Sequence, residues 1–255
     1  MTLNEIDKYF RSYLKIEDFP IDPSRNGIQV DNSNPSAKEI KKVAFAVDAC
    51  METIEKASKA NADLLFVHHG LFWGGCCPIV GDFGKRIRTL IQNDLALYAC
   101  HIPLDANEIV GNNYGLAKRL GLENVISFGE WHGMCLGAAG SFIKPVTIDE
   151  LVKKLFPQGE QPLHILPFGK KEISSVAIIS GGAGEDVDQA IAAGYDVYIT
   201  GEISHEQYHV ALEAGINVIA GGHYQTETVG VSLVMKKLEE DLGLETFFID
   251  VPTGL

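Results

Sequence analysis

The sequence predicts an α/β protein made of two similar halves, each with a mostly parallel or mixed sheet, and a small α+β insert between them. Three observations indicate this fold. Short apolar runs alternate with amphipathic stretches at the spacing of βαβ units. The later part of the chain repeats the pattern of the earlier part, with the first two strands at one offset and the third at a shorter one. Several apolar runs end in histidine or acidic residues, and parallel α/β sheets bind ligands beyond the carboxyl ends of their strands.

Composition narrows the class of protein. The chain has 255 residues, of which 46% are hydrophobic and 22% are charged, as in a globular protein with a sizeable core. No uninterrupted apolar stretch approaches the ~18 residues of a spanning helix, and the start of the chain lacks the features of a signal peptide. The net charge of −13 argues against a nucleic-acid binder. The five cysteines form no CxxC pair, which favours reduced thiols in a cytoplasmic protein.

The first half shows clear periodicity. Ile6, Phe10 and Leu14 recur at helical spacing, and Gly121 is a good residue to close a helix. Val43 to Val47 and Asp63 to Val67 are apolar runs of strand length. We expect helices at 3–14, 51–60, 84–92 and 112–120, and strands at 28–30, 43–47, 63–67 and 95–100.

The alternation of short apolar runs with amphipathic stretches stops in the middle of the chain and then resumes. Thr147 and Glu150 form the capping-box pattern that begins a helix. Around it we expect short strands at 131–134, 135–142 and 161–167, and after it strands at 176–179, 196–199 and 246–251 and helices at 204–214 and 229–242. The predicted organisation is therefore a first α/β repeat at 1–126, an α+β insert at 127–170, and a second α/β repeat at 171–255. The C-terminal part is expected to pack back on the first repeat.

An internal duplication explains why the strand–helix pattern resumes. The run that begins at Val43 matches the run at Val176, and Asp63 matches Asp196, so both pairs are 133 positions apart. After the third strand of each half, His101 and Asp105 match His223 and Glu227, 122 positions later. We interpret the chain as a duplication with the insert between its copies.

Histidine and acidic residues at the expected strand ends are the candidate functional residues. In a duplicated fold whose halves face each other, these strand ends would converge on one metal cleft. Imidazole and carboxylate together suit Zn, Fe, Mn or Ni, and their number fits two divalent metal ions about 3.5–4 Å apart. The candidate metal ligands are His68, His69, Asp105, His223 and Glu227, and the candidates for orienting ligands or moving protons are His101 and Glu202.

His68 and His69 are adjacent, and adjacent strand residues point to opposite faces of a sheet. Both can serve one cluster only if the strand has already broken, and Gly70 favours such a break. For other features the simpler interpretation is preferred. His132, His164, His205 and His209 are interpreted as surface or structural residues, Cys76 and Cys77 as loop thiols rather than soft-metal ligands, and Ser180 to Gly184 as a tight turn rather than a phosphate cradle.

An ordered set of motifs resembles one known family over nearly the whole chain. The motifs are Asn26-Gly27-Ile28-Gln29-Val30, His68-His69-Gly70-Leu71-Phe72-Trp73, His101-Ile102-Pro103-Leu104-Asp105-Ala106, Gly111-Asn112-Asn113, Thr200-Gly201-Glu202 and Gly222-His223-Tyr224-Gln225-Thr226-Glu227. They resemble the Nif-three-like family, whose members are often labelled GTP cyclohydrolase I type 2 homologues.

The resemblance implies a toroidal homohexamer, a trimer of dimers, whose two-domain subunits carry dinuclear metal sites. It assigns His69, Asp105 and Glu227 to one metal ion. It assigns His68 and His223 to the other ion, with Glu227 bridging. Every ligand position is filled in this sequence.

Two functions follow as hypotheses. The first is a dinuclear metal-dependent hydrolase, GTP cyclohydrolase-like, that acts on a small nucleotide or related substrate through a metal-activated water. The second is a non-catalytic metal-binding or regulatory protein for metal storage, insertion or transcription. Nucleic-acid binding through the ring is a weaker third hypothesis, given the charge of −13.

Overall fold

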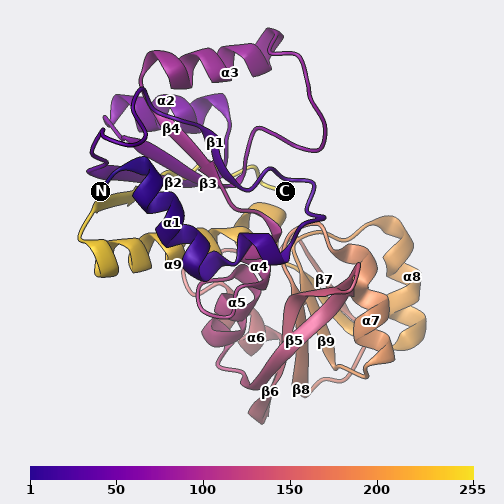
Figure 1. The fold of residues 1–255 in the computed structure, drawn as a ribbon. Coiled ribbons are helices and arrows are strands. Elements are labelled where there is room, and N and C mark those ends of the chain that lie inside the picture. The colour runs from indigo at the N-terminus through magenta and orange to yellow at the C-terminus, as the bar shows by residue number, and fades with distance from the viewer. The chain divides into compact units, whose positions relative to one another are not determined.

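The chain folds into two compact α/β units, shown in a computed structural model that describes residues 1–255 (Figure 1). One unit comprises Met1–Leu104 and Val231–Val251, and the other comprises Asp105–Gly230 and Pro252–Leu255. The boundary falls within two helices, α4 (Ile102–Ala106) and α9 (His223–Leu242). The predicted fold class, a duplicated α/β protein with mixed sheets, is confirmed.

The first unit is built on a five-stranded sheet in the order β1-β4-β3-β2-β11. The four strands from β4 to β11 are parallel, and β1 runs antiparallel at one edge. The last strand of the chain thus returns to the first sheet and pairs with β2. The strands are β1 (Gly27–Val30), β2 (Lys42–Asp48), β3 (Leu64–His69), β4 (Ala96–Ala99) and β11 (Glu245–Phe248).

Both faces of this sheet are buried. Phe66 and Tyr98 point to one face, where both rings pack against Phe10 at centroid distances of 5.0 and 4.9 Å. Leu65 and Leu97 point to the other face, because successive strand residues alternate, and join the core beneath α2 and α3. This double burial explains the continuous apolar runs. The helices are α1 (Leu3–Leu14), the 3-10 turn η1 (Ile16–Asp18), α2 (Met51–Lys59) and α3 (Gly81–Gln92).

The second unit is built on a six-stranded sheet in the order β5-β6-β8-β9-β10-β7. Only the central β8, β9 and β10 are parallel, and the outer strands are antiparallel. The strands of the expected insert, β5 to β7, are therefore part of this sheet, so the expected boundaries after residues 126 and 170 do not coincide with the two units. The strands are β5 (Glu123–Trp131), β6 (Met134–Val146), β7 (His164–Pro167), β8 (Ile173–Ile179), β9 (Val197–Thr200) and β10 (Asn217–Ala220).

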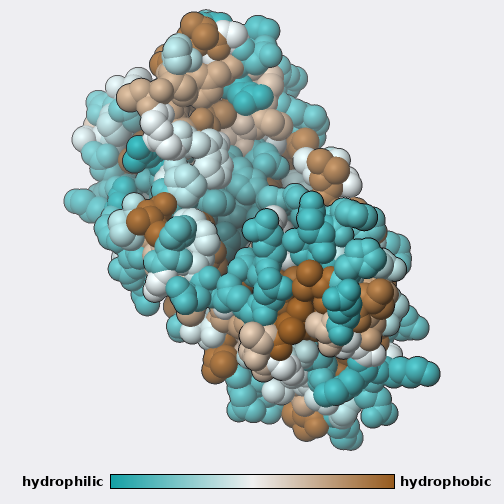
Figure 2. All heavy atoms as spheres, turned by 90° about the vertical axis from the view of Figure 1, so that its right-hand side faces the viewer, coloured by the Kyte–Doolittle hydropathy of each residue, from teal (hydrophilic) through white to brown (hydrophobic).

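Helices complete the second unit. Its core packs Val187, Ala190 and Ala211 of α7 and α8 against Ala177 and Tyr198 of the sheet. Near α8 and β7 some apolar side chains stay exposed, and Figure 2, which faces this side, shows hydrophobic side chains grouped within a largely hydrophilic surface. Every helix falls short of the length or hydrophobicity that a membrane span requires. The helices are α5 (Asn112–Leu120), α6 (Ile148–Leu155), the 3-10 turn η2 (Gly184–Asp186), α7 (Val187–Ala192) and α8 (His205–Ala214).

Two local predictions have clear outcomes. The capping box before α6 is confirmed, because Thr147 Oγ1 accepts from Glu150 N and Glu150 Oε2 accepts from Thr147 N. The prediction of a short strand at 131–134 is wrong, whereas the strand predicted at 135–142 is confirmed as part of the longer β6. Residues 132 and 133 form the turn of one long hairpin, and both positions have positive φ angles of 50° and 82°. This hairpin joins the two longest strands of the sheet.

Strand register shows the duplication directly. Val43 pairs with Leu64 in the first sheet, and Val176 pairs with Val197 in the second, each 133 positions later. The side chains at the strand starts repeat as well. Asp63 Oδ2 accepts from the backbone N–H groups of residues 41 and 42 at 2.9 and 3.1 Å. Asp196 Oδ2 accepts from those of residues 174 and 175 at the same two distances.

The third strands correct one detail of the predicted repeat. Leu64 pairs with Ala96, and the equivalent Val197 pairs with Asn217, which places the third strands 121 positions apart rather than 122. The register therefore equates His101 with Gly222, not with His223. His101 precedes α4, whereas His223 is the first residue of α9. The shared spacing of histidine and acid is not a structural equivalence.

Candidate metal centre

Three histidines of the first unit form a potential metal-binding cluster. His68 and His69 end β3, and His101 follows β4. One donor nitrogen of each lies within 4.8 Å of the others. The ring centroids of His68 and His69 are 4.6 Å apart, although both residues belong to the strand. The prediction that the strand breaks before this pair is wrong, because β3 extends through His69.

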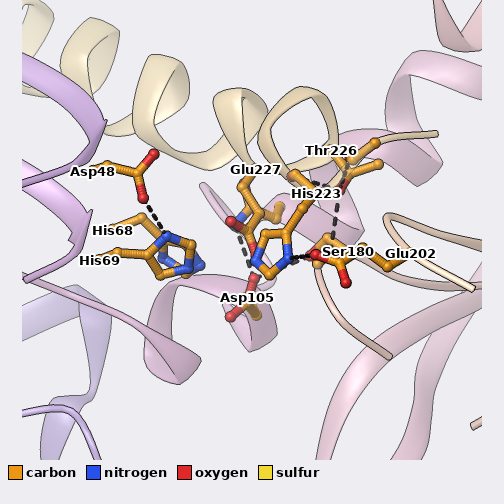
Figure 3. A network of polar contacts seen from close by, with 12 residues as sticks. Asp48, His68, His69, Asp105, Ser180, Glu202, His223, Thr226 and Glu227 are labelled. Atoms are coloured by element: carbon orange, nitrogen blue, oxygen red, sulfur yellow. Dashed lines mark hydrogen bonds and ion pairs between the residues drawn. The ribbon is translucent and has the colours of Figure 1, made fainter. Parts of the chain in front are cut away.

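The two imidazoles are held by neighbours on opposite sides of β3. His68 Nδ1 donates to Cys100 O at 2.9 Å. His69 Nδ1 donates to Asp48 Oδ1 at 2.8 Å, a contact that Figure 3 shows. Cys100 follows β4 and Asp48 ends β2, so each ring is drawn towards a different adjacent strand. Because a carbonyl or carboxylate oxygen only accepts, Nδ1 carries the proton and Nε2 carries the lone pair that a metal ion requires.

Gly70 allows the chain to leave the strand at this point. A Cβ added to Gly70 would lie 2.3 Å from Gln29 Nε2 and 2.6 Å from the Ala99 Cβ. Gln29 Oε1 in turn accepts from Leu71 N at 2.6 Å. The glycine is required here by close packing against β1 and β4, which fixes the backbone that carries the histidines.

Asp22 is a site residue that sequence reasoning missed. It is buried, and its Oδ1 accepts from His101 Nδ1 at 2.9 Å and from Ser24 N at 2.9 Å. Its Oδ2 accepts from Asn26 Nδ2 at 2.8 Å and Ile102 N at 3.1 Å. Burial acts to raise the pKa of Asp22, but the bonds and charge of His101 and the other donors outweigh it and lower that pKa. The residue lies in a turn 79 positions before His101, and no spacing rule connects the two.

We expect Asp22→Asn to weaken metal binding by ~10-fold or more, because Asp22 holds His101 against the proposed ligands His68 and His69, and residues that orient a metal site contribute to its affinity. Competition with a chromogenic chelator measures the affinity. Asp18→Asn is the matched control, since Asp18 is exposed on the same segment. Equal affinity in both variants would show that His101 takes no part in metal binding, and melting of the metal-free proteins separates this effect from misfolding.

His223 and Glu227 form the principal polar pair of the second unit. They begin α9 and lie one turn apart, with His223 Nε2 3.1 Å from Glu227 Oε1. The predicted helix began at residue 229, so the structure places both residues on the helix rather than in a loop. His223 Nδ1 donates to Glu202 Oε1 at 2.5 Å (Figure 3). Burial acts to lower the pKa of His223, but Glu227 and Glu202 outweigh it and raise that pKa to about 9.

Asp105 is held by a buried polar network in the same unit. Its Oδ1 accepts from Asn112 Nδ2 at 2.8 Å and from Ser180 Oγ at 3.0 Å. Asn113 Oδ1 accepts from Ser180 N at 2.7 Å, and Asn113 Nδ2 donates to Asp105 O at 3.2 Å. Both asparagines are fully buried, which is rare for amides unless they are hydrogen-bonded. Sequence reasoning noted the asparagines only as part of a motif, although two polar residues on the buried face of a helix were a usable signal.

The glycine-rich turn after β8 makes room for His223 and Glu227. Gly181 has a φ of 67°, and a Cβ there would lie 2.3 Å from Glu227 Oε1. Gly181 N donates to Thr226 Oγ1 at 3.1 Å, which ties the turn to α9. A Cβ on Gly182 would meet His223 Cε1 at 3.7 Å. The turn therefore allows close approach of α9, which agrees with its interpretation as a tight turn rather than a phosphate cradle.

The candidate residues thus form one set in each unit. His68, His69 and His101 lie together in the first, and Asp105, Glu202, His223 and Glu227 lie in the second. The four remaining histidines lie elsewhere: His132 in the hairpin turn, His164 in β7, and His205 and His209 on α8. His164, His205 and His209 are exposed. The structure therefore contains histidine and acidic groups of the kind that bind metal ions.

Comparison with known proteins gives a consistent result. A model of the family described as Duf34/NIF3 (NGG1p interacting factor 3) matches residues 1–254. The chain is 45% identical to a "GTP cyclohydrolase 1 type 2 homolog" of Treponema pallidum and 43% identical to one of Archaeoglobus fulgidus, each over 100% of both chains. It is similar to a crystal structure from Thermus thermophilus, with a TM-score of 0.89 and 38% identity over 100% of both chains.

Proposed function

This chain belongs to the Duf34/NIF3 family, and on that premise we propose that it is a dinuclear metal-dependent hydrolase of a small nucleotide or related substrate. The observation that supports this most strongly is the histidine cluster of the first unit. All three rings have Nδ1 bonded to an oxygen acceptor, at 2.9, 2.8 and 2.9 Å for His68, His69 and His101. Imidazoles that bind metal ions through Nε2 typically have this arrangement.

The chemistry of the second set also fits a metal ion. His223 Nε2 and Glu227 Oε1 share a proton across 3.1 Å, and both atoms are metal ligands once that proton leaves. Asp105 is held in place by donors to Oδ1 from Asn112 and Ser180. We propose that His69, Asp105 and Glu227 hold one ion and that His68 and His223 hold the other, with Glu227 shared. Zn, Fe, Mn and Ni all accept this mixture of nitrogen and oxygen ligands.

The protein's own residues would have distinct tasks around such ions. When bound, the ions supply Lewis-acid chemistry that lowers the pKa of water and polarises the bond to be hydrolysed. Glu202 Oε1 holds the Nδ1 proton of His223 and fixes the orientation of that ring. The Glu202 side chain is 51% exposed, so it can exchange a proton with solvent or substrate. Asp22 holds His101 in the same way in the first unit.

Metal removal and reloading tests the proposed hydrolase. The protein is stripped with a chelator, reloaded separately with Zn, Mn, Fe or Ni, and incubated with GTP, other nucleotides, phosphoesters and cyclic amides. We expect turnover of at least one substrate that depends on the metal and is lost on removal. Assayed at saturating metal, Glu202→Gln should lower turnover, whereas the exposed control Glu213→Gln should leave turnover unchanged.

A different outcome would support the alternative function. Full metal loading with no turnover on any substrate, for every metal, contradicts the hydrolase and supports a non-catalytic metal-binding or regulatory protein. The homohexamer and the cytoplasmic location stay predictions made from the sequence.

A further inference from the structure

The second unit contains a cavity of about 460 Å³ beside Glu202. This volume lies within the range of small-molecule sites and accommodates a two-ring heterocycle. The glycine-rich turn after β8 forms part of its wall. The side chains that line it come from the end of β5, from η2 and from the segment that begins α8: Trp131, Glu185, Asp186, Glu202, Ser204 and Gln207.

The charge of the cavity restricts what it can bind. Three of its side chains are carboxylates, Glu185, Asp186 and Glu202, and none of its lining residues is basic. Burial, reinforced by the charge of Glu185, raises the pKa of Asp186 even though Gln189 donates to it. A phosphate group would face like charge here, whereas a cation or an N–H donor would relieve it. The cavity therefore suits the ring of a nucleotide-like molecule and not its phosphates.

The wall of the cavity is held in place by one side chain. Gln189 Oε1 accepts from Glu130 N at 2.8 Å, and Gln189 Nε2 donates to Glu130 O at 3.0 Å and to Asp186 Oδ1 at 2.7 Å. Glu130 directly precedes Trp131. Trp131 and the half-buried carboxylate of Asp186 are thus fixed relative to each other, which lowers the entropic cost of binding a rigid ring between them.

We propose that this cavity is the ring-binding subsite of the proposed hydrolase and takes a planar, neutral or cationic nitrogen heterocycle with adjacent N–H donors. The ring lies on Trp131, and its N–H edge donates to Asp186 or Glu185. Glu202 lines the cavity and also bonds to His223. A heterocycle bound in the cavity therefore has the substituent opposite its N–H edge next to Glu202 and His223. The subsite rests on the proposed function, because it assigns the substrate class to the same centre.

Direct binding tests the subsite without any need for turnover. Guanosine, which has adjacent N–H donors, is titrated against the full chain as purified, by calorimetry and by the emission of Trp131 in a Trp73→Phe background. Only two tryptophans are present, so Trp131 alone reports. We expect binding that inorganic triphosphate does not displace, with adenosine at least ~10-fold weaker because its edge offers one donor and one acceptor. 7-Methylguanosine, whose ring is cationic, should bind more tightly than guanosine.

Substitutions of the lining residues test whether guanosine binds in this cavity. Asp186→Asn and Trp131→Ala should each weaken guanosine binding by ~10-fold or more, since each removes a charged acceptor or a stacking surface. Asp188→Asn, on the neighbouring helix and outside the cavity lining, is the matched control and should bind as the parent protein does. Thermal melting identifies any variant that fails to fold, and Glu185→Gln then provides a second test.

The outcomes separate the subsite from the hydrolase. No binding of guanosine, or equal binding by all variants, overturns the subsite even if metal-dependent turnover is found. Binding that is lost in the cavity variants establishes the subsite even if no substrate is turned over.

Discussion

Replacing Asp105 by asparagine should reduce the metal content of the protein from about two ions per chain to about one. Asparagine keeps an oxygen that accepts from Asn112 Nδ2 and Ser180 Oγ, so the buried network is retained. It loses the negative charge that a divalent ion requires in a site of mixed nitrogen and oxygen ligands. We expect turnover to fall by about 10²-fold or more, because both ions contribute to the proposed reaction.

Elemental analysis of the purified protein measures this effect. Asp149→Asn serves as control, because Asp149 lies on α6 and outside the network. Retention of both ions in Asp105→Asn would contradict the assignment of Asp105 as a ligand. Loss of both would contradict separate terminal ligands and indicate that the two ions bind as one unit.

The candidate ligands could be found from the sequence because their chemistry stands out at strand ends. His68 and His69 end an apolar run, and that signal does not depend on tertiary structure. Their supporting residues could not be found in the same way. Asp22 reaches His101 from a turn 79 positions away, and Asp48 reaches His69 from a neighbouring strand. Such pairings are decided by strand order, which local patterns do not reveal.

Local sequence patterns do not reveal the start of α9, because its residues are weak helix formers. His223, Tyr224 and Thr226 have low intrinsic propensity and follow two glycines. Tertiary contacts outweigh this preference. Thr226 Oγ1 donates to Gly222 O at 2.9 Å and accepts from Gly181 N at 3.1 Å, which fixes the first turn against the loop after β8. The helix could be expected only from residue 229, where apolar periodicity begins.

The sequence also conceals the length of the hairpin strands β5 and β6. Glycines interrupt its sequence, and glycine between apolar residues is ordinarily a turn signal. In the structure Gly137 lies within β6, and a Cβ there would lie 2.3 Å from Ile178 O on β8. Gly140 approaches Glu123 O on β5 at 3.0 Å by the same measure. These glycines mark close approach of neighbouring strands, which only the three-dimensional pairing shows.

The duplication offers an internal comparison of one buried carboxylate with its counterpart. Asp196 is buried, and besides two backbone amides it accepts from Lys170 Nζ at 2.6 Å. Asp63 accepts from the same two kinds of amide, but its lysine partner Lys38 lies 3.7 Å away and its side chain is 22% exposed. Burial acts to raise the pKa of Asp196, but Lys170 and the amides outweigh it and lower that pKa below the usual 3.8.

We therefore expect Asp196→Asn to lower the free energy of unfolding of the second unit by about 2 kcal/mol at neutral pH, and Asp63→Asn to lower that of the first by about 1 kcal/mol. Urea titration measures both, with Trp131 reporting on the second unit and Trp73 on the first, each with the other tryptophan replaced by phenylalanine.

The pH dependence of this effect follows from the lowered pKa of Asp196. A carboxylate with a lowered pKa contributes stability above its unfolded pKa and loses it as the pH falls through its folded pKa. The difference between parent and Asp196→Asn should therefore be constant above about pH 5 and shrink as the pH falls below about 4. A difference that persists unchanged at pH 2 would show that the charge of Asp196 contributes nothing and that the loss comes from replacing an accepting oxygen with an NH2 donor.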